Sequence, residues 1–178
     1  PESLTSINEY SFYGCSSLTQ IDIPQNVNII KQYAFAGSGL TSIILPNKLQ
    51  IISNNLFSGC LELKIVKLPD NITDIEGEAF KNCQKLEKID LPDQIITINE
   101  NTFCNCISLK ELILPNNLQA LKWQFISGCT GIKNITIPNS IKNVLYSGSN
   151  WPFTGSFIQN VIFEDGITFS LPHAFYKV

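Results

Sequence analysis

The hydrophobic pattern of the chain repeats with a long period. Prolines mark this period, because they recur about every 23 residues with one step of 22. Before each later proline stands an apolar phrase whose last two members alternate with a polar residue, as in a β-strand. Clear copies of this phrase are Leu18-x-x-Ile21-x-Ile23, Leu63-x-x-Val66-x-Leu68, Leu86-x-x-Ile89-x-Leu91 and Leu109-x-x-Leu112-x-Leu114. Self-similarity at this period is typical of a solenoid.

The second half of each repeat, after the proline, carries another apolar pair and then an aromatic residue. In one copy these are Val27 and Ile30, followed by Ala34-Phe35. This half predicts a turn or one helical turn whose aromatic side chain fills the interior. Such small units bury their apolar face only by stacking on neighbours. We therefore expect a column of stacked aromatic side chains: Phe12, Phe35, Phe57, Phe80 and Phe103.

The full phrase Phe-x-x-Cys-x-x-Leu-x-x-Ile-x-Ile/Leu-Pro is seen from Phe12 to Pro24 and from Phe80 to Pro92, and again from Phe103 to Pro115 with Leu112 at the Ile position. It resembles the BspA-like, Treponema-type leucine-rich repeats over essentially the whole chain. The resemblance implies a right-handed repeat solenoid with one short parallel strand per repeat and turns or short helical turns on the other side. It also implies a non-catalytic protein that is secreted or on the cell surface, where such proteins are associated with adhesion to host matrix proteins or other cells.

We expect residues 1–178 to form a single solenoid of about seven repeats, and an excerpt of a longer array because both ends fall inside repeats. Three places depart from the pattern. Ser38 replaces the repeat cysteine one residue closer to Leu40, which accounts for the step of 22. Ile126 replaces the phenylalanine, with Phe125 before it. The unit at about 141–166 is lengthened, and Glu164 stands at the proline position.

Composition narrows the function classes. The net charge of -3 and pI near 5.1 provide no basic stripe for a phosphate backbone, which disfavours nucleic-acid binding. No apolar run approaches the roughly 18 residues that a membrane span needs, so we expect no membrane insertion of this segment, which also shows no targeting signal.

Five of the six cysteines share one repeat position, and we expect them to form a column of buried free thiols. Parallel rungs about 4.8 Å apart, with the Cβ atoms pointing the same way, do not suit disulfide geometry. Cys104 lies off this column and is expected to be exposed. His173 is the only histidine and is predicted to lie on the surface, so the sequence offers no metal site, no cofactor site and no catalytic residues.

The candidate binding site is the outer face of the predicted strands. Polar and apolar residues between the inward positions point outward because side chains alternate with period two. The alternative to a contact surface is a face that is only exposed to solvent, whose β-branched residues reflect the preference of strands for them. The candidate contact residues for a protein or glycan partner are Gln20, Ser42, Ile65, Lys88, Glu111 and Asn134 in one column, continued by Asn160, and Asp22, Ile44, Lys67, Asp90, Ile113 and Thr136 in the other, continued by Ile162.

Trp151 in the lengthened unit is a second candidate contact, because exposed Trp is favoured at binding hot spots. The alternative, which we favour, is that Trp123, Trp151, Phe153 and Phe157 close a less regular end of the core. Asn71 and Asn134 fit the glycan-acceptor pattern. The function classes left open are a binding or adhesion module, a structural spacer in a larger surface protein, and an intracellular protein-interaction scaffold.

Overall fold

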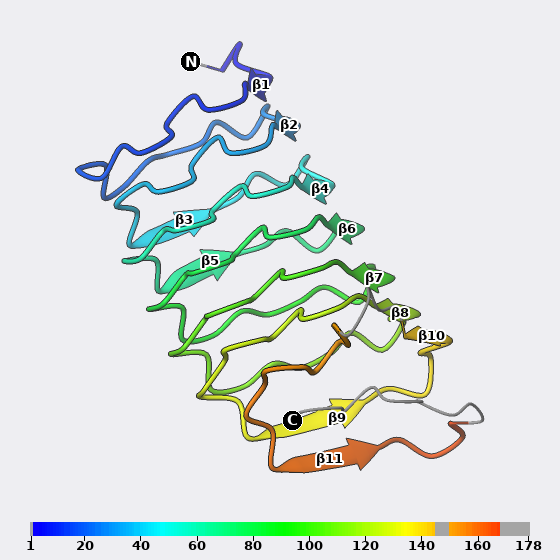
Figure 1. The fold of residues 1–178 in the computed structure, drawn as a ribbon. Helices are drawn as coiled ribbons and strands as arrows, with labels where there is room; N and C mark the ends of the chain where they lie inside the picture. Colours follow the sequence, from blue (N-terminus) through cyan, green and yellow to red (C-terminus); the bar gives the residue numbers. More distant parts are fainter. Residues whose placement is uncertain (1, 145–149, 168–178) are drawn as a thin grey trace.

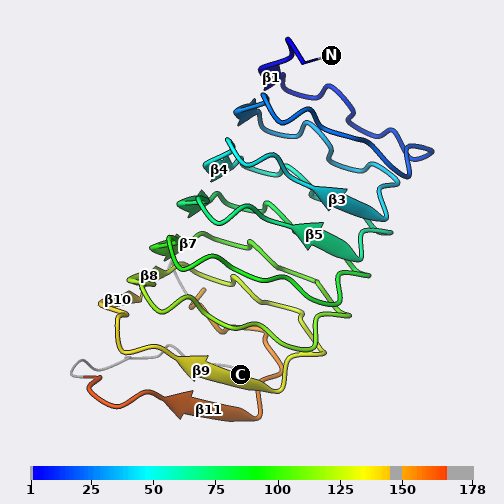
Figure 2. The same cartoon turned by 180° about the vertical axis from the view of Figure 1, so that it is seen from behind.

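The computed structural model describes residues 2–144 and 150–167. Successive turns of the chain stack into one solenoid, which Figures 1 and 2 show from two sides. The described residues contain β-strands, turns and irregular segments but no helix. The predicted solenoid with a spacing of about 23 residues is therefore confirmed, and the aromatic half of each repeat is a turn.

The strands before the prolines form the predicted ladder, here called the pre-proline ladder. Its strands are β3 (Ser42–Ile44), β5 (Ile65–Lys67), β9 (Asn134–Ile137) and β11 (Asn160–Phe163). They pair in parallel as β3 with β5 and β9 with β11, and Asn160 stands opposite Asn134. This pairing confirms the register expected for the lengthened last unit.

A second ladder, which the sequence did not predict, lies after the prolines. This post-proline ladder contains β1 (Ser6–Ile7), β2 (Ile29–Ile30), β4 (Ile51–Ile52), β6 (Asp74–Ile75), β7 (Thr97–Ile98), β8 (Ala120–Leu121) and β10 (Asn143–Val144). Five of these strands form one parallel sheet in the order β10-β8-β7-β6-β4, visible along one edge of the solenoid in Figure 1. The second apolar pair of each repeat is thus a two-residue strand.

The phenylalanine column is confirmed. Neighbouring rings from Phe12 to Phe103 stack nearly parallel, with centroids 5.2 to 5.8 Å apart. In each turn, two residues with positive φ bracket the phenylalanine, as Tyr33 and Gly37 do around Phe35. These left-handed residues reverse the chain direction around the ring, which explains why Gly and Asn recur at the second position.

The cysteine column is likewise buried and unbridged from Cys60 to Cys129, whereas Cys15 in the first turn is exposed. Each buried thiol donates a hydrogen bond to the carbonyl oxygen of the phenylalanine in the preceding turn, as Cys106 does to Phe80 at 3.1 Å. The thiols therefore fill space and also satisfy a buried acceptor. Cys104 is partly buried, so the expectation that it is exposed was wrong; its side chain lies on the turn between Phe103 and the column.

The shortened turn depends on a glycine. A Cβ added to Gly39 would overlap the backbone carbonyl oxygen of Ser16 in the preceding turn. The backbones of the two turns therefore approach too closely at this position for any residue with a Cβ.

Candidate functional site

The twelve contact residues predicted for the strand face are all exposed, on the pre-proline strands or at the equivalent positions of turns that have no strand there. In β5, for example, Ile65 and Lys67 are exposed while Val66 between them is buried. The same alternation places all twelve candidates, together with Asn160 and Ile162, outside the core. The structure thus brings these side chains together on one surface, while their role as contacts stays a prediction.

Exposed isoleucines are the unusual component of this face. Four of them, Ile44, Ile65, Ile113 and Ile162, have 63, 63, 66 and 56% of their residue surface exposed. Ile44 and Ile65 lie diagonally across β3 and β5, because Ser42 pairs with Ile65 and Ile44 with Lys67. The isoleucines form separate apolar spots between polar residues, and they do not join into one column.

Two hollows open on the same face, where neighbouring segments do not pair as strands. The first, about 360 Å³ in volume, lies between residues 20–25 and β3 and is lined by Asp22 and Ile44. The second, about 470 Å³, lies between residues 110–116 and β9 and is lined by Glu111 and Ile113. The ladder therefore combines two paired strand segments with two recesses.

Charges on the middle of the ladder are largely self-compensating. Lys88 Nζ lies 2.9 Å from Asp90 Oδ1, and both side chains are well exposed. The hydrogen bond that the Lys88 ammonium donates to the Asp90 carboxylate, together with the charge of that carboxylate, raises the pKa of Lys88. Exposed ion pairs contribute little to stability. This pair therefore mainly determines how charge is distributed on this part of the surface.

The glycan-acceptor candidates lie in different surroundings. Asn134 is exposed on the pre-proline ladder, where its Oδ1 accepts a hydrogen bond from Asn160 Nδ2 at 2.7 Å. Asn71 is partly buried beside the post-proline ladder and lines a third hollow. Modification at either position stays a prediction.

Trp151 is partly buried and tied to the neighbouring turn. Its carbonyl accepts the Gln124 N–H at 3.0 Å, and its own N–H donates to Thr154 Oγ1 at 3.0 Å. Phe153 is buried, in line with the favoured core role. Phe157 is exposed, with Lys133 Nζ 5.7 Å from its ring centroid, so the expectation that it closes the core was wrong.

Reactive groups in the described segments are few and mostly structural. No set of three or more His, Cys, Asp or Glu side chains within residues 2–144 and 150–167 is arranged to hold a metal ion. Burial raises the pKa of the Cys83, Cys106 and Cys129 thiols, which favours the neutral and unreactive form. His173 lies outside the described residues. The two hollows on the pre-proline face could not be predicted from the sequence, because the distance between neighbouring strands is not encoded in the residues of one repeat.

Asp74 and Asn99 form a polar contact on the post-proline ladder, where Asn99 Nδ2 donates to Asp74 Oδ1 at 2.9 Å. Burial, and then the neighbouring charge of Glu76, raise the pKa of Asp74. Lys122 pairs with Glu100 at 3.4 Å in the next turns. These contacts cross-link successive turns and do not form a reactive pair.

A parallel β-solenoid with an exposed strand face is the architecture of a repeat protein-interaction module. The chain belongs to the family of BspA type leucine-rich repeat regions, whose model matches residues 1–87, 28–150 and 73–178. Proteins with such repeats are typically non-catalytic and generally bind proteins. In the described part of the chain, no helix has the length and apolar character required to cross a bilayer.

Solved structures with the same fold come from several bacteria. A leucine-rich repeat protein of Bacteroides ovatus is 30% identical, with a TM-score of 0.67 over 93% of this chain and 48% of its own. The Treponema pallidum leucine-rich repeat protein is 26% identical, with a TM-score of 0.65 over 81% of this chain and 66% of its own. A leucine-rich cell surface protein of Faecalibacterium prausnitzii is 24% identical, with a TM-score of 0.54 over 92% of this chain and 58% of its own, and shows the fold alone.

This chain therefore spans about half to two thirds of the length of these relatives. No curated protein matches it.

Proposed function

We propose that this chain is a non-catalytic adhesion module that holds a protein or glycan partner on its pre-proline ladder, outside the cell. The observation that carries the proposal is the set of four isoleucines, each more than half exposed, on a face whose strands are fixed by the stacked core. Apolar side chains on a rigid surface gain free energy when a partner covers them. The ladder offers such side chains without requiring a conformational change.

The two hollows support a partner that spans several repeats. Each hollow places one exposed isoleucine beside acidic or amide groups, Ile44 beside Asp22 in the first and Ile113 beside Glu111 and Asn134 in the second. Binding interfaces commonly combine an apolar anchor in a recess with a polar rim. A protein partner fits this composition best, since branched aliphatic side chains outnumber aromatic rings on the ladder.

The extracellular location rests on the family resemblance. The Faecalibacterium prausnitzii protein of this fold is a cell surface protein, which makes the same location worth testing here. The four buried free thiols, Cys60, Cys83, Cys106 and Cys129, do not argue for a reducing compartment, because they stack in parallel rungs that do not suit a disulfide.

The test replaces four ladder residues together, as Ile44→Ser, Lys67→Ser, Asp90→Ser and Ile113→Ser. Binding to immobilised extracellular-matrix proteins and to whole cells is measured beside a control that carries Leu61→Ser and Ile107→Ser, two exposed apolar residues outside the ladder. Circular dichroism and thermal unfolding verify that both variants fold.

We expect the ladder variant to lose at least tenfold in affinity and the control to bind as the unmodified chain does. Equal binding by both variants would exclude the ladder as the contact. Failure of the unmodified chain to bind any matrix protein or cell would instead favour a spacer, and variants with one repeat deleted would then retain function in the parent protein.

A further inference from the structure

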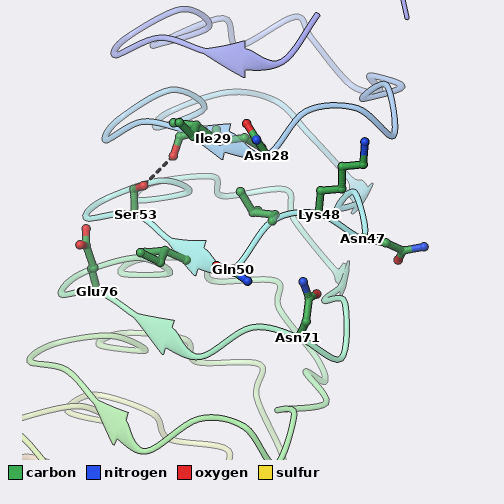
Figure 3. A pocket seen from close by; sticks show the side chains of 11 residues that line it. Asn28, Ile29, Asn47, Lys48, Gln50, Ser53, Asn71 and Glu76 are labelled. Carbon is green, nitrogen blue, oxygen red and sulfur yellow. Dashed lines mark hydrogen bonds between the residues drawn. The ribbon is translucent and has the colours of Figure 1, made fainter.

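The third hollow lies on the post-proline ladder, away from the face discussed above, and has a volume of about 700 Å³. Figure 3 shows its side chains arranged over three successive turns of the solenoid. Ile29 and Ile51 line it with apolar surface, of which 51% and 45% is exposed. Ile29 lies on β2, which pairs with β1, and Ile51 lies on β4, which pairs with β6, so the backbone fixes the position of each residue.

Four side-chain amides surround these isoleucines: Asn28, Asn47, Gln50 and Asn71. None of the four side chains makes a hydrogen bond to another described residue, although Asn47 and Gln50 use backbone groups to link turns. Elsewhere in the described chain many amides tie neighbouring turns together, as Asn105 Nδ2 does to Asn82 Oδ1 at 2.9 Å. The amides of the hollow are thus available as donors and acceptors for a ligand.

Two charged groups of opposite sign lie at opposite ends of the hollow, Lys48 where β4 is approached and Glu76 where the following turn leaves β6 (Figure 3). Lys48 Nζ donates to Asn26 Oδ1 at 2.8 Å, and Glu76 Oε2 accepts the N–H of Asn54 at 2.7 Å. Neither takes part in an ion pair within residues 2–144 and 150–167. Both charges therefore remain open to a ligand.

We propose that this hollow binds an extended peptide segment with aliphatic side chains, an acidic group over Lys48 and a basic group over Glu76. Free side-chain amides suit the N–H and C=O groups of an extended backbone, and the exposed isoleucines suit its aliphatic side chains. None of the residues lining the hollow is aromatic, so a stacked sugar ring has no platform there. The proposal concerns a face distinct from the pre-proline ladder and does not depend on the function proposed for it.

The size of the hollow defines the length of the ligand. From Lys48 to Ser53 the chain advances five residues, roughly 16 Å at the rise of an extended strand. A segment of four residues spans roughly 13 Å at this rise, with aliphatic residues in the middle, and the long charged side chains at its two ends reach over the remaining distance.

The experiment uses the protein with ¹³C-labelled isoleucine methyl groups, made without N-glycans because a glycan on Asn71 would occupy the hollow. The probes are two capped tetrapeptides, acetyl-Asp-Leu-Leu-Lys-amide and acetyl-Lys-Leu-Leu-Asp-amide, which cover both chain directions. Acetyl-Asp-Gly-Gly-Lys-amide and chitobiose serve as the comparison ligands. Methyl chemical shifts are followed by NMR during titration.

We expect the leucine peptides to shift the Ile29 and Ile51 methyl signals, and the glycine peptide to bind at least threefold more weakly. Lys48→Glu should weaken the leucine peptides at least threefold, whereas Lys142→Glu, on the same ladder but outside the hollow, should leave their affinity unchanged.

Three outcomes overturn the proposal: no shift of the Ile29 and Ile51 signals at millimolar peptide, tighter binding of chitobiose than of the peptides, or equal effects of the two lysine variants. Binding at the pre-proline ladder would shift Ile44, Ile65 and Ile113 instead, so failure here is distinguishable from failure of the function proposed above.

Discussion

Between Phe35 and Phe103 the phenylalanine rings lie within 13° of parallel, whereas Phe125 and Phe153 meet edge to face at 72°. The change occurs where Ile126 takes the phenylalanine position and the aromatic residue moves one place earlier. The backbone does not follow this change, because the N–H of Phe103 still donates to the carbonyl of Phe125 at 2.7 Å.

The turns from Phe35 to Phe103 and the turns after Ile126 differ in how their aromatic rings pack, but the same hydrogen-bonded backbone ladders run through both. Beyond Ile126, β10 still pairs with β8, and β11 with β9. The hydrogen-bonded ladders therefore continue through a unit whose interior is packed differently. This comparison teaches that the repeat register is held by backbone pairing and buried aliphatic residues, while the ring stack adds packing within the regular turns.

The largest expected effect is at the centre of the regular stack. Phe80→Ala removes a fully buried ring that stacks on Phe57 and Phe103, and it should lower the free energy of unfolding by about 3 to 5 kcal/mol. Chemical denaturation followed by circular dichroism measures this change. A loss below about 1 kcal/mol would show that the ring stack is dispensable even in the regular region.

The second prediction tests the boundary itself. Ile126→Phe restores the repeat residue, but Phe125 already fills the neighbouring space, so we expect overpacking to destabilise the fold by about 1 to 3 kcal/mol. The double variant Phe125→Ala with Ile126→Phe, which recreates the Ala-Phe pair of other repeats, should recover at least half of this loss. If the double variant is less stable than the single one, the irregular unit depends on the edge-to-face contact itself.

The third prediction concerns the thiol column that runs beside the regular stack. Cys106→Ala removes one of the two donors to the Phe80 carbonyl oxygen, which keeps the N–H of Cys83 at 3.1 Å, and it creates a small void; together these should cost about 1 to 3 kcal/mol. Cys106→Ser should cost less, since a small shift lets the hydroxyl donate to the same oxygen. Thermal unfolding of the two variants ranks them, and a more stable alanine variant would assign the thiol a filling role alone.

Much of this comparison could be predicted from the sequence. The period of about 23 residues defines a stacked solenoid, and residues recurring at one position, such as Phe80 and Cys106, must share a column in it. Alternation in segments such as Ile65–Lys67 identifies the exposed face. The sequence also predicts where the packing of the aromatic rings changes, because Ile126 stands at the repeat position that phenylalanine occupies in the other units.

Other features depend on distances that a single repeat does not encode. The post-proline strands are only two residues long. In β2 (Ile29–Ile30) the exposed Ile29 directly follows the exposed Asn28, so the segment lacks the alternation by which a strand is recognised. The hollows arise where neighbouring turns do not pair, which depends on spacing between repeats. The exposure of Phe157 depends on how the lengthened unit folds back, for which its sequence has no second copy to compare.

The smallest expected effect lies at the boundary between the two regions, at Cys129, whose thiol donates to the Phe103 carbonyl at 2.9 Å. Burial raises the pKa of this thiol from 9.0 to about 12. The unfolded chain therefore releases the proton near pH 9 while the folded chain keeps it, so stability is complete below about pH 9 and declines as the pH rises toward 12. For this one thiol the loss in the free energy of unfolding between about pH 8 and pH 9.5 amounts to about 0.8 kcal/mol.

Denaturation at the two pH values should show a decline in stability that is smaller by that amount in Cys129→Ser than in the unmodified chain, because serine does not ionise in this range. Equal declines would mean that the thiol ionises as readily in the folded chain as in the unfolded one, and hence that the column opens to solvent where the regular stack ends.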